Sequence, residues 1–166
     1  MFISRFISDC IYEGHKDRIL PSFFSISAFL LVLGALTGGI YVLFLDIPLF
    51  HKVLNFLQFE IMLILWAQMA YLSAIKKYLK ILTGFLLAAL ASIGLSLVFL
   101  LVGMDPLTGV YLGSTLGYCL LMILYIQELI NFYPPGKMSL VILFPYLDKY
   151  KILIGVGFFT ALGLFG

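Results

Sequence analysis

Three polar side chains interrupt one long apolar run of this sequence and are its main candidates for chemistry. Gln58, Glu60 and Gln68 lie within residues 55–75, among aliphatic and aromatic neighbours. A carboxylate inside a membrane span is costly and usually faces the interior of a helix bundle or a water-filled cavity. On a helix, Glu60 and Gln68 are about 80° apart, so one broad face holds both. The three residues therefore predict a polar patch on a substrate path or in a proton relay.

Structural roles are the alternative for residues of this kind. Glu60 lies five positions after the start of its run, so its side chain can reach the membrane interface by snorkelling. Glu128 follows the run 107–127 and is interpreted as an interfacial charge. Trp66 falls in mid-span, away from the interfacial belt where Trp is enriched, and is expected to pack inside the bundle.

The apolar runs supply the helices that must position the candidate patch. The 166 residues are 63% hydrophobic and 11% charged, whereas a soluble domain has about 25% charged residues. A helix needs about 20 apolar residues to cross the membrane. The sequence therefore predicts an all-α membrane protein, a polytopic helical bundle. Four full spans and a truncated fifth are expected, at residues 22–45, 55–75, 81–104, 107–127 and 152–166.

The basic residues predict how the spans are oriented. All but Lys52 fall in alternate gaps between the apolar runs: Arg5, Lys16, Arg18, Lys76, Lys77, Lys80, Lys137, Lys149 and Lys151. Short cytoplasmic loops retain their Lys and Arg residues. We therefore expect a cytoplasmic N-terminus and cytoplasmic loops at 76–80 and 131–151. The loops at 46–54 and 103–106 are expected to be external.

Both ends of the sequence predict that it is a fragment of a longer protein. The last run, 152–166, has only 15 residues, fewer than a full span requires. At the other end, apolar residues between Phe2 and Ile11 recur at helical spacing. They predict either a surface helix in the membrane interface or the end of an upstream span, of which the second is favoured.

Small residues at four-residue spacing predict close packing of the helices. The rows are Gly34 and Gly38; Gly84, Ala88, Ser92 and Ser96; and Gly109, Gly113 and Gly117. Such rows let helix backbones approach one another closely. Because they are common in helical membrane proteins, they indicate packing and no particular function.

Motifs for other chemistry are absent from the sequence. His15 and His51 fall on opposite sides of the predicted membrane, so they cannot share a metal ion. The sequence has no HExxH, no GxSxG and no glycine-rich phosphate loop. A net charge of +2, with basic residues at the membrane edges, does not fit a nucleic-acid partner. We expect no enzyme activity, no metal and no cofactor.

Several short blocks, in matching order and spacing along the chain, resemble one known family. They are the segment Arg5-Phe6-Ile7-Ser8-Asp9-Cys10-Ile11-Tyr12-Glu13 with Arg18-Ile19-Leu20-Pro21, Trp66, Leu72-Ser73-x-x-Lys76-x-Tyr78-x-x-Ile81, Tyr133-Pro134 and Leu153-Ile154-Gly155. Together they are similar to the PelG family, the membrane exporter of the Pel exopolysaccharide system. That family resembles the multidrug/oligosaccharidyl-lipid/polysaccharide exporter superfamily. Glu60 and Gln68 depart from it, because apolar residues are expected at their positions.

The resemblance implies a fold, a location and partners. Members are expected to be two-lobed helical transporters that work by alternating access in a bacterial inner membrane, and this chain would cover mostly the N-terminal lobe. The implied partners are the lipid bilayer, a saccharide polymer or lipid-linked saccharide, a cytoplasmic glycosyltransferase and membrane accessory subunits. A candidate docking surface for the glycosyltransferase lies in the predicted cytoplasmic loop, at Tyr146, Lys149, Tyr150 and Lys151.

Two functions are therefore carried forward. The first is an inner-membrane component of exopolysaccharide export that moves polymer or lipid-linked saccharide across the membrane. The alternative is a non-transporting scaffold or assembly subunit of a polysaccharide synthesis complex. In a scaffold, Gln58, Glu60 and Gln68 are expected to face other helices and to be fully hydrogen-bonded, with no access to water.

Overall fold

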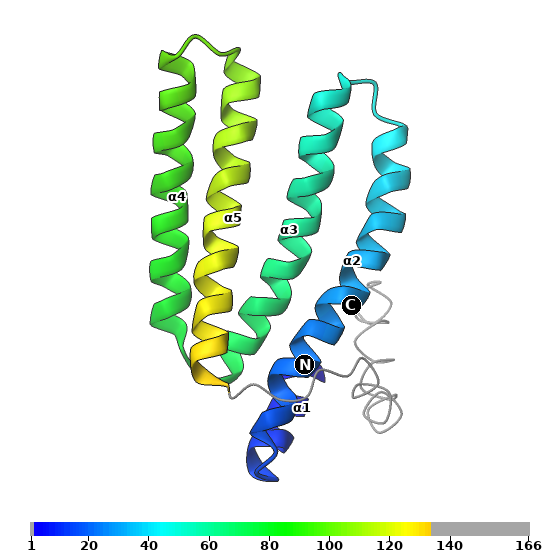
Figure 1. Ribbon diagram of the computed structural model, residues 1–166, viewed down its shortest axis with the longest axis vertical. Helices are drawn as coiled ribbons and strands as arrows, with labels where there is room; N and C mark the ends of the chain where they lie inside the picture. The colour runs from blue at the N-terminus through cyan, green and yellow to red at the C-terminus, as the bar shows by residue number, and fades with distance from the viewer. Residues whose placement is uncertain (1, 134–166) are drawn as a thin grey trace, which may run out of the picture.

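The structure, a computed structural model, describes residues 2–133, with side chains from residue 5 onward. Its helices are α1 (Phe2–Tyr12), the short 3-10 turn η1 (Lys16–Arg18), α2 (Ile19–Leu43), α3 (Leu49–Ala74), α4 (Tyr78–Leu101) and α5 (Pro106–Phe132). Figure 1 shows two antiparallel hairpins, α2–α3 and α4–α5, with α3 and α5 adjacent between them. The described residues contain no strand, so the predicted all-helical class is confirmed.

Four helices are long and apolar enough to cross a membrane, as predicted, but their bounds differ from the apolar runs. Helix α3 begins at Leu49, inside the loop predicted at 46–54, and α5 continues to Phe132, past the start of the loop predicted at 131–151. Backbone hydrogen bonding carries a helix beyond its apolar residues, because polar side chains are tolerated where the helix reaches the interface. The fifth span predicted at 152–166 lies outside the described residues.

Local sequence explains where the hairpin turns fall. Asp105 is the N-cap of α5, and its carboxylate accepts a hydrogen bond from the Thr108 backbone N–H at 3.3 Å. Pro106 follows in the first turn, where the missing N–H costs nothing. At the other end of α4, Lys76 has φ 58°, a left-handed conformation that stops α3 and starts the turn into α4.

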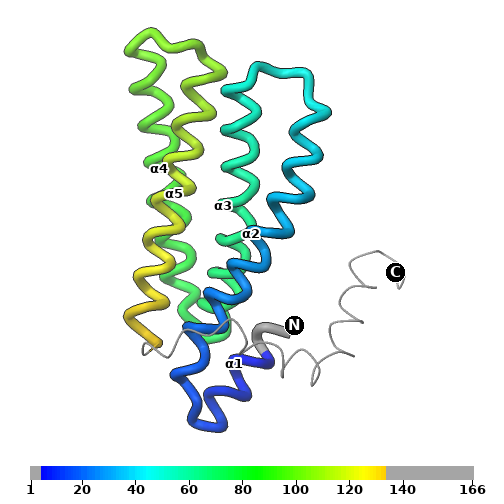
Figure 2. The backbone as a smooth tube through the Cα atoms, turned by 45° about the vertical axis from the view of Figure 1, so that its right-hand side comes forward, coloured from blue at the N-terminus to red at the C-terminus, as the bar shows by residue number. Residues whose placement is uncertain are grey.

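Helix α1 packs against α3 at the end of the bundle where α2 begins (Figure 2). Phe6, Ile7 and Cys10 are buried and share one core with Tyr71 and Leu72 of α3. The apolar repeat predicted near the N-terminus is therefore helical, and Phe6, Ile7 and Cys10 of it are covered by protein, whereas Ile11 is exposed. Burial raises the pKa of the Cys10 thiol to about 11, with the nearby Glu13 carboxylate adding to the rise.

The glycine rows pack as predicted, most closely between α4 and α5. A side chain at Gly117 would collide with Ser92 and with the backbone oxygen of Ala88, and one at Gly113 with the backbone of Ser96. On α2, a Cβ at Gly38 would lie 2.7 Å from the Phe59 ring of α3. The small residues of each row therefore set how near the helices lie.

The prediction that Trp66 packs inside the bundle is wrong. Its side chain is 67% exposed. Between lipid-facing and protein-facing positions there is little hydrophobic preference, because lipid tails are as apolar as a protein core. Gln68, two residues further along α3, takes an interior position instead and is fully buried.

Candidate functional site

Gln58 joins α3 to α5 by hydrogen bonds. Its side-chain amide nitrogen lies 3.2 Å from the Tyr111 carbonyl oxygen, 2.8 Å from the Ser114 hydroxyl and 2.9 Å from the Thr115 hydroxyl. Both hydroxyls donate in turn to the same Tyr111 carbonyl. Because α5 concentrates three acceptors in one turn, the amide nitrogen has more acceptors than its two hydrogens can use. Its own carbonyl oxygen is left to accept from elsewhere.

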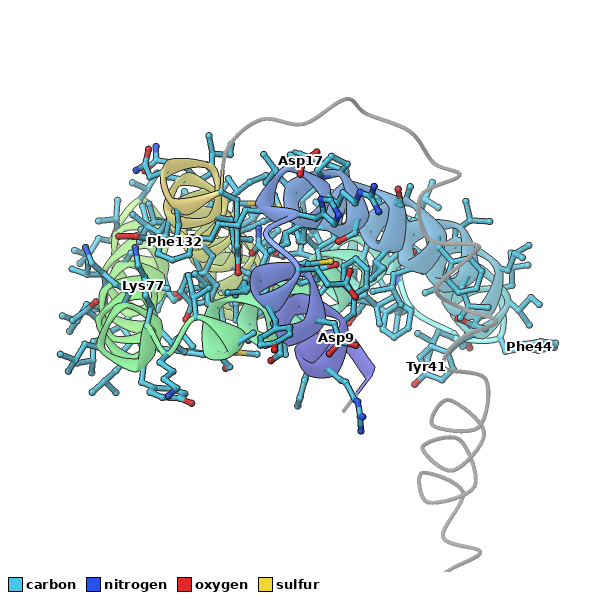
Figure 3. All side chains as sticks on the ribbon, turned by 90° about the horizontal axis from the view of Figure 1, so that it is seen from below. Asp9, Asp17, Tyr41, Phe44, Lys77 and Phe132 are labelled. Carbon is cyan, nitrogen blue, oxygen red and sulfur yellow. The ribbon has the colours of Figure 1, made fainter. Side chains whose placement is uncertain are left out.

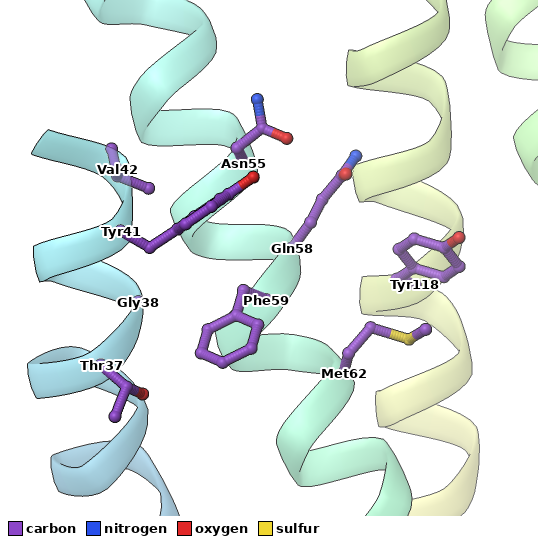
Figure 4. Close-up of a pocket in the computed structure, with 9 residues that line it drawn as sticks. All are labelled: Thr37, Gly38, Tyr41, Val42, Asn55, Gln58, Phe59, Met62 and Tyr118. Atoms are coloured by element: carbon purple, nitrogen blue, oxygen red, sulfur yellow. The ribbon is translucent and has the colours of Figure 1, made fainter. Parts of the chain in front are cut away.

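A cavity of about 610 Å³ opens beside Gln58, between α2, α3 and α5 (Figure 4). The lining residues are neutral and combine aromatic rings, amides and a hydroxyl: Thr37, Gly38, Tyr41, Val42, Asn55, Gln58, Phe59, Met62 and Tyr118. This volume is typical of ligand sites, where apolar walls bind and a few polar groups orient the ligand. The cavity is thus suited to an uncharged ligand with both apolar faces and hydrogen-bonding groups.

The polar lining groups are partly engaged and partly available. The Asn55 amide donates to the His51 carbonyl oxygen at 3.0 Å, and the Thr37 hydroxyl donates to the Leu33 carbonyl oxygen at 2.9 Å. These local bonds fix the side-chain orientations, and each amide oxygen and the Thr37 oxygen still has lone pairs to offer. Figure 4 shows the Tyr41 side chain reaching from α2 toward Asn55 across the cavity.

Gln68 forms a second polar link between α3 and α5. Its amide nitrogen donates to the Met122 carbonyl oxygen at 3.1 Å, and the residue is completely buried. The amide oxygen has no hydrogen-bond partner among the described residues. A buried unsatisfied oxygen of this kind costs free energy, so the need to fill space does not explain why an amide side chain stands at this position.

Glu60 lies at the other interface of α3, against α2. Its side chain is 7% exposed, and neither carboxyl oxygen has a hydrogen-bond partner within the part of the chain that the structure describes. A Cβ added at Gly34 would lie 2.8 and 2.9 Å from those two oxygens. The glycine at position 34 therefore makes the room that the carboxyl group occupies.

The structure divides the three predicted site residues between two interfaces. Gln58 and Gln68 face α5, Glu60 faces α2, and of the three only Gln58 lines the cavity. Snorkelling does not describe Glu60, which is covered by protein. The predicted docking residues Tyr146, Lys149, Tyr150 and Lys151 lie outside the described residues.

Sequence reasoning missed most of the cavity lining. Tyr41 and Tyr118 carry no signal of their own in runs so rich in aromatic residues. Asn55 and Gln58 did carry a signal, because two amides three residues apart share a helix face and so indicate a polar surface there. Phe59 and Met62 continue the same face of α3, yet as apolar residues they look like ordinary core.

Charged groups gather at the end of the bundle that holds the α3–α4 turn. The Lys77 ammonium lies 2.8 Å from one carboxylate oxygen of Glu128, and the Lys80 ammonium lies 2.9 Å from the other. Lys77 also lies over the Phe132 ring, 5.0 Å from its centroid. Glu128, interpreted above as an interfacial charge, is thus paired with two lysines. Nowhere in residues 2–133 do three or more His, Cys, Asp or Glu side chains gather to hold a metal ion.

Four helices of membrane-spanning length, three of them lining a cavity, make this a multi-pass helical membrane protein. Residues 1–166 match the model of the PelG family, described as "Putative exopolysaccharide Exporter (EPS-E)". The chain belongs to the PelG family, and its general role is in exopolysaccharide export. No curated protein and no solved structure shows significant similarity to it.

Proposed function

We propose that the chain is an inner-membrane component of exopolysaccharide export and that saccharide, as polymer or lipid-linked saccharide, passes through the cavity beside Gln58. The observation that carries the proposal is the lining of this cavity, which is about 610 Å³ in volume and has no charged side chain. Its aromatic rings and amides match the two kinds of surface that a sugar presents.

The match rests on simple chemistry. One face of a sugar ring carries C–H groups that pack well on an aromatic ring, and here Tyr41, Phe59 and Tyr118 offer such rings. Sugar hydroxyls both donate and accept, and the side-chain amides of Asn55 and Gln58 do the same. Interactions of this kind are individually weak, so they can guide a polymer without holding it in place.

The unpaired polar groups favour transport over the scaffold alternative. A scaffold was expected to have Gln58, Glu60 and Gln68 fully hydrogen-bonded. Among the described residues, the Glu60 carboxyl group and the Gln68 amide oxygen find no partner. A buried polar group without a partner calls for an explanation, and a path that rearranges during export supplies one.

Secretion of exopolysaccharide by cells tests the proposal. The Asn55→Ala variant should export less polysaccharide than the unmodified protein at an equal level in the membrane, because the cavity loses one of its two amides. Trp66→Ala is the matched control, since this exposed side chain lies on the same helix and does not line the cavity. Equal export from both variants would remove the cavity from the path.

Access of water to the cavity separates transport from the scaffold alternative. After replacement of Cys10 and Cys119, a cysteine introduced at Met62 should react with a membrane-impermeant maleimide. A scaffold packed against other helices should leave the same cysteine unreactive in intact membranes.

The partners and the orientation belong to the same proposal. With basic loops on the cytoplasmic side, the loop containing Tyr146, Lys149, Tyr150 and Lys151 would meet a cytoplasmic glycosyltransferase. Reversing the charges of Lys149 and Lys151 should then reduce co-purification of the glycosyltransferase. Unchanged co-purification would exclude these lysines from the docking surface.

A further inference from the structure

A second cavity lies on the α4–α5 hairpin, away from the proposed saccharide path. It has a volume of about 240 Å³, and its lining changes from charged and polar to apolar along the helices: Asn131, Glu128, Gln127, Lys80, Thr83, Gly84, Tyr125, Leu124 and Leu87. The polar part lies where the uncharged runs of the two helices end. We name this feature the α4–α5 groove.

The charges around the α4–α5 groove do not balance. Lys77 and Lys80 share the single carboxylate of Glu128, and Lys76 adds a further positive charge in the adjoining turn. The lysines also sit at the N-terminal end of α4, where the helix dipole already contributes positive potential. In Figure 3, Lys77 lies beside Phe132 and well apart from the labelled acids Asp9 and Asp17. The lining of the groove itself holds one charge of each sign, Lys80 and Glu128, so the excess positive charge that would attract an anion comes from Lys77 and Lys76 beside it.

The floor of the groove is held by one hydrogen bond and one close contact between α4 and α5. The Tyr125 hydroxyl donates to the Ile81 carbonyl oxygen at 2.8 Å, which ties α5 to α4. Gly84 leaves space that the Tyr125 ring fills, since a Cβ there would lie 2.6 Å from it. Beyond this floor, Leu87 and Leu124 continue the groove with apolar side chains.

We propose that the α4–α5 groove binds the phosphate headgroup of an anionic phospholipid. Lys80 pairs with the phosphate and Asn131 donates a hydrogen bond to it, while the acyl chains lie along Leu87 and Leu124. The Thr83 hydroxyl, which donates to the Lys80 carbonyl oxygen at 3.3 Å, lies beside the phosphate. A charged polar end that grades into an apolar wall matches a lipid at the membrane interface, and basic pockets between helices are known to hold such headgroups. The inference is independent of the saccharide path.

Native mass spectrometry of the full chain, titrated with phosphatidylglycerol or phosphatidylcholine of equal acyl length, tests this proposal. One phosphatidylglycerol should bind more tightly than phosphatidylcholine. Lys80→Gln should weaken its binding about five-fold, the effect of one lysine near a membrane surface, and Lys80→Arg should retain it. Lys52→Gln, which removes a lysine at the opposite end of α3, should bind as the unmodified protein does.

Glu128→Gln separates lipid binding from a purely structural ion cluster. If the groove binds phosphate, this variant should bind phosphatidylglycerol at least as tightly, because a repelling carboxylate is removed. Asn131→Leu leaves both ion pairs in place and should weaken binding, which keeps the test open if Lys80→Gln fails to fold. Equal affinity for the two lipids, equal losses in Lys80→Gln and Lys52→Gln, or displacement of the lipid by inorganic phosphate would overturn the proposal.

Discussion

Helix α5 meets its two neighbours in different ways. Toward α4 it presents Gly113 and Gly117, whose missing side chains let the backbones approach closely. Toward α3 it presents the Tyr111 carbonyl and two hydroxyls, which together receive the Gln58 amide. The α4–α5 interface combines these close backbone contacts with polar links nearer its other end, from Tyr125 to Ile81 and from Lys80 to Glu128. At the α3–α5 interface, side-chain amides supply the links.

The difference separates a rigid part of the molecule from an adjustable one. A close backbone contact through glycines leaves no free space between the helices, because any added atom forces them apart. Hydrogen bonds between side chains and carbonyls can be exchanged for others as helices shift, and in membranes each contributes only modestly. We therefore expect the α4–α5 hairpin to move as one body, with rearrangement confined to the interfaces of α3, where the saccharide cavity lies.

The largest effect is expected from Gly117→Leu. The new side chain would meet the Ser92 side chain and the Ala88 backbone oxygen, 2.9 Å from the added Cβ, and the backbone oxygen cannot move aside. The free energy of unfolding in mixed micelles should fall by about 3 kcal/mol. Gly94→Leu is the matched control, because nothing lies within 4 Å of a Cβ at that α4 position. If both variants lost equal stability, the α4–α5 interface would not be sterically determined.

A smaller effect is expected at the α2–α3 interface, from Gly34→Ala. The added methyl group would lie 2.5 Å from Leu63 Cδ1 and 2.8 Å from one Glu60 oxygen, both at the ends of flexible side chains. These can shift, so the variant should be about 1 kcal/mol less stable than Gly39→Ala, whose Cβ meets nothing within 4 Å. Thermal unfolding of the two variants in detergent measures the difference, and identical values would mean that Glu60 needs no space at Gly34.

A double-mutant cycle measures the α3–α5 interface directly. Gln58→Leu and Thr115→Val remove the two ends of one hydrogen bond, which is 2.9 Å long. Their coupling free energy should be about 0.6 kcal/mol, the average for hydrogen bonds between membrane helices. A coupling of several times this size would make the α3–α5 interface as fixed as the α4–α5 interface, and the proposed division into rigid and adjustable parts would fail.

Sequence patterns predicted the helices and their small-residue rows because both depend on residues near one another in the chain. The four-residue spacing of a glycine row can be read from the sequence. Close packing at Gly113 could therefore be predicted without knowing that its partner is Ser96 of α4. The apolar runs likewise predicted four spans, with bounds that missed the polar turns at the helix ends.

The site was predicted less well because the sequence does not show which neighbouring helix each face of α3 contacts. Glu60 and Gln68 were placed on one broad face, yet an angle of about 80° is enough for them to meet α2 and α5 respectively. Trp66 was expected inside the bundle because it falls in mid-span, but distance from the interface does not decide which face of a helix a residue occupies when lipid is as apolar as the bundle. Tyr41 and Tyr118 could be recognised as cavity residues only from the packing of α2, α3 and α5 against one another.

The smallest change in stability is expected from Gln68→Leu, which tests whether the α3–α5 interface is adjustable along its whole length. The Gln68 amide nitrogen donates one hydrogen bond to the Met122 carbonyl oxygen of α5, but its amide oxygen is unpaired among the described residues. Leucine loses the bond and removes the unpaired group, so the unfolding free energy should change by less than about 1 kcal/mol in either direction. If the amide serves export, secreted polysaccharide should nevertheless fall at an unchanged protein level. A large loss of stability would instead place Gln68 among the residues that hold the bundle together, and the α3–α5 interface would then be fixed along its length.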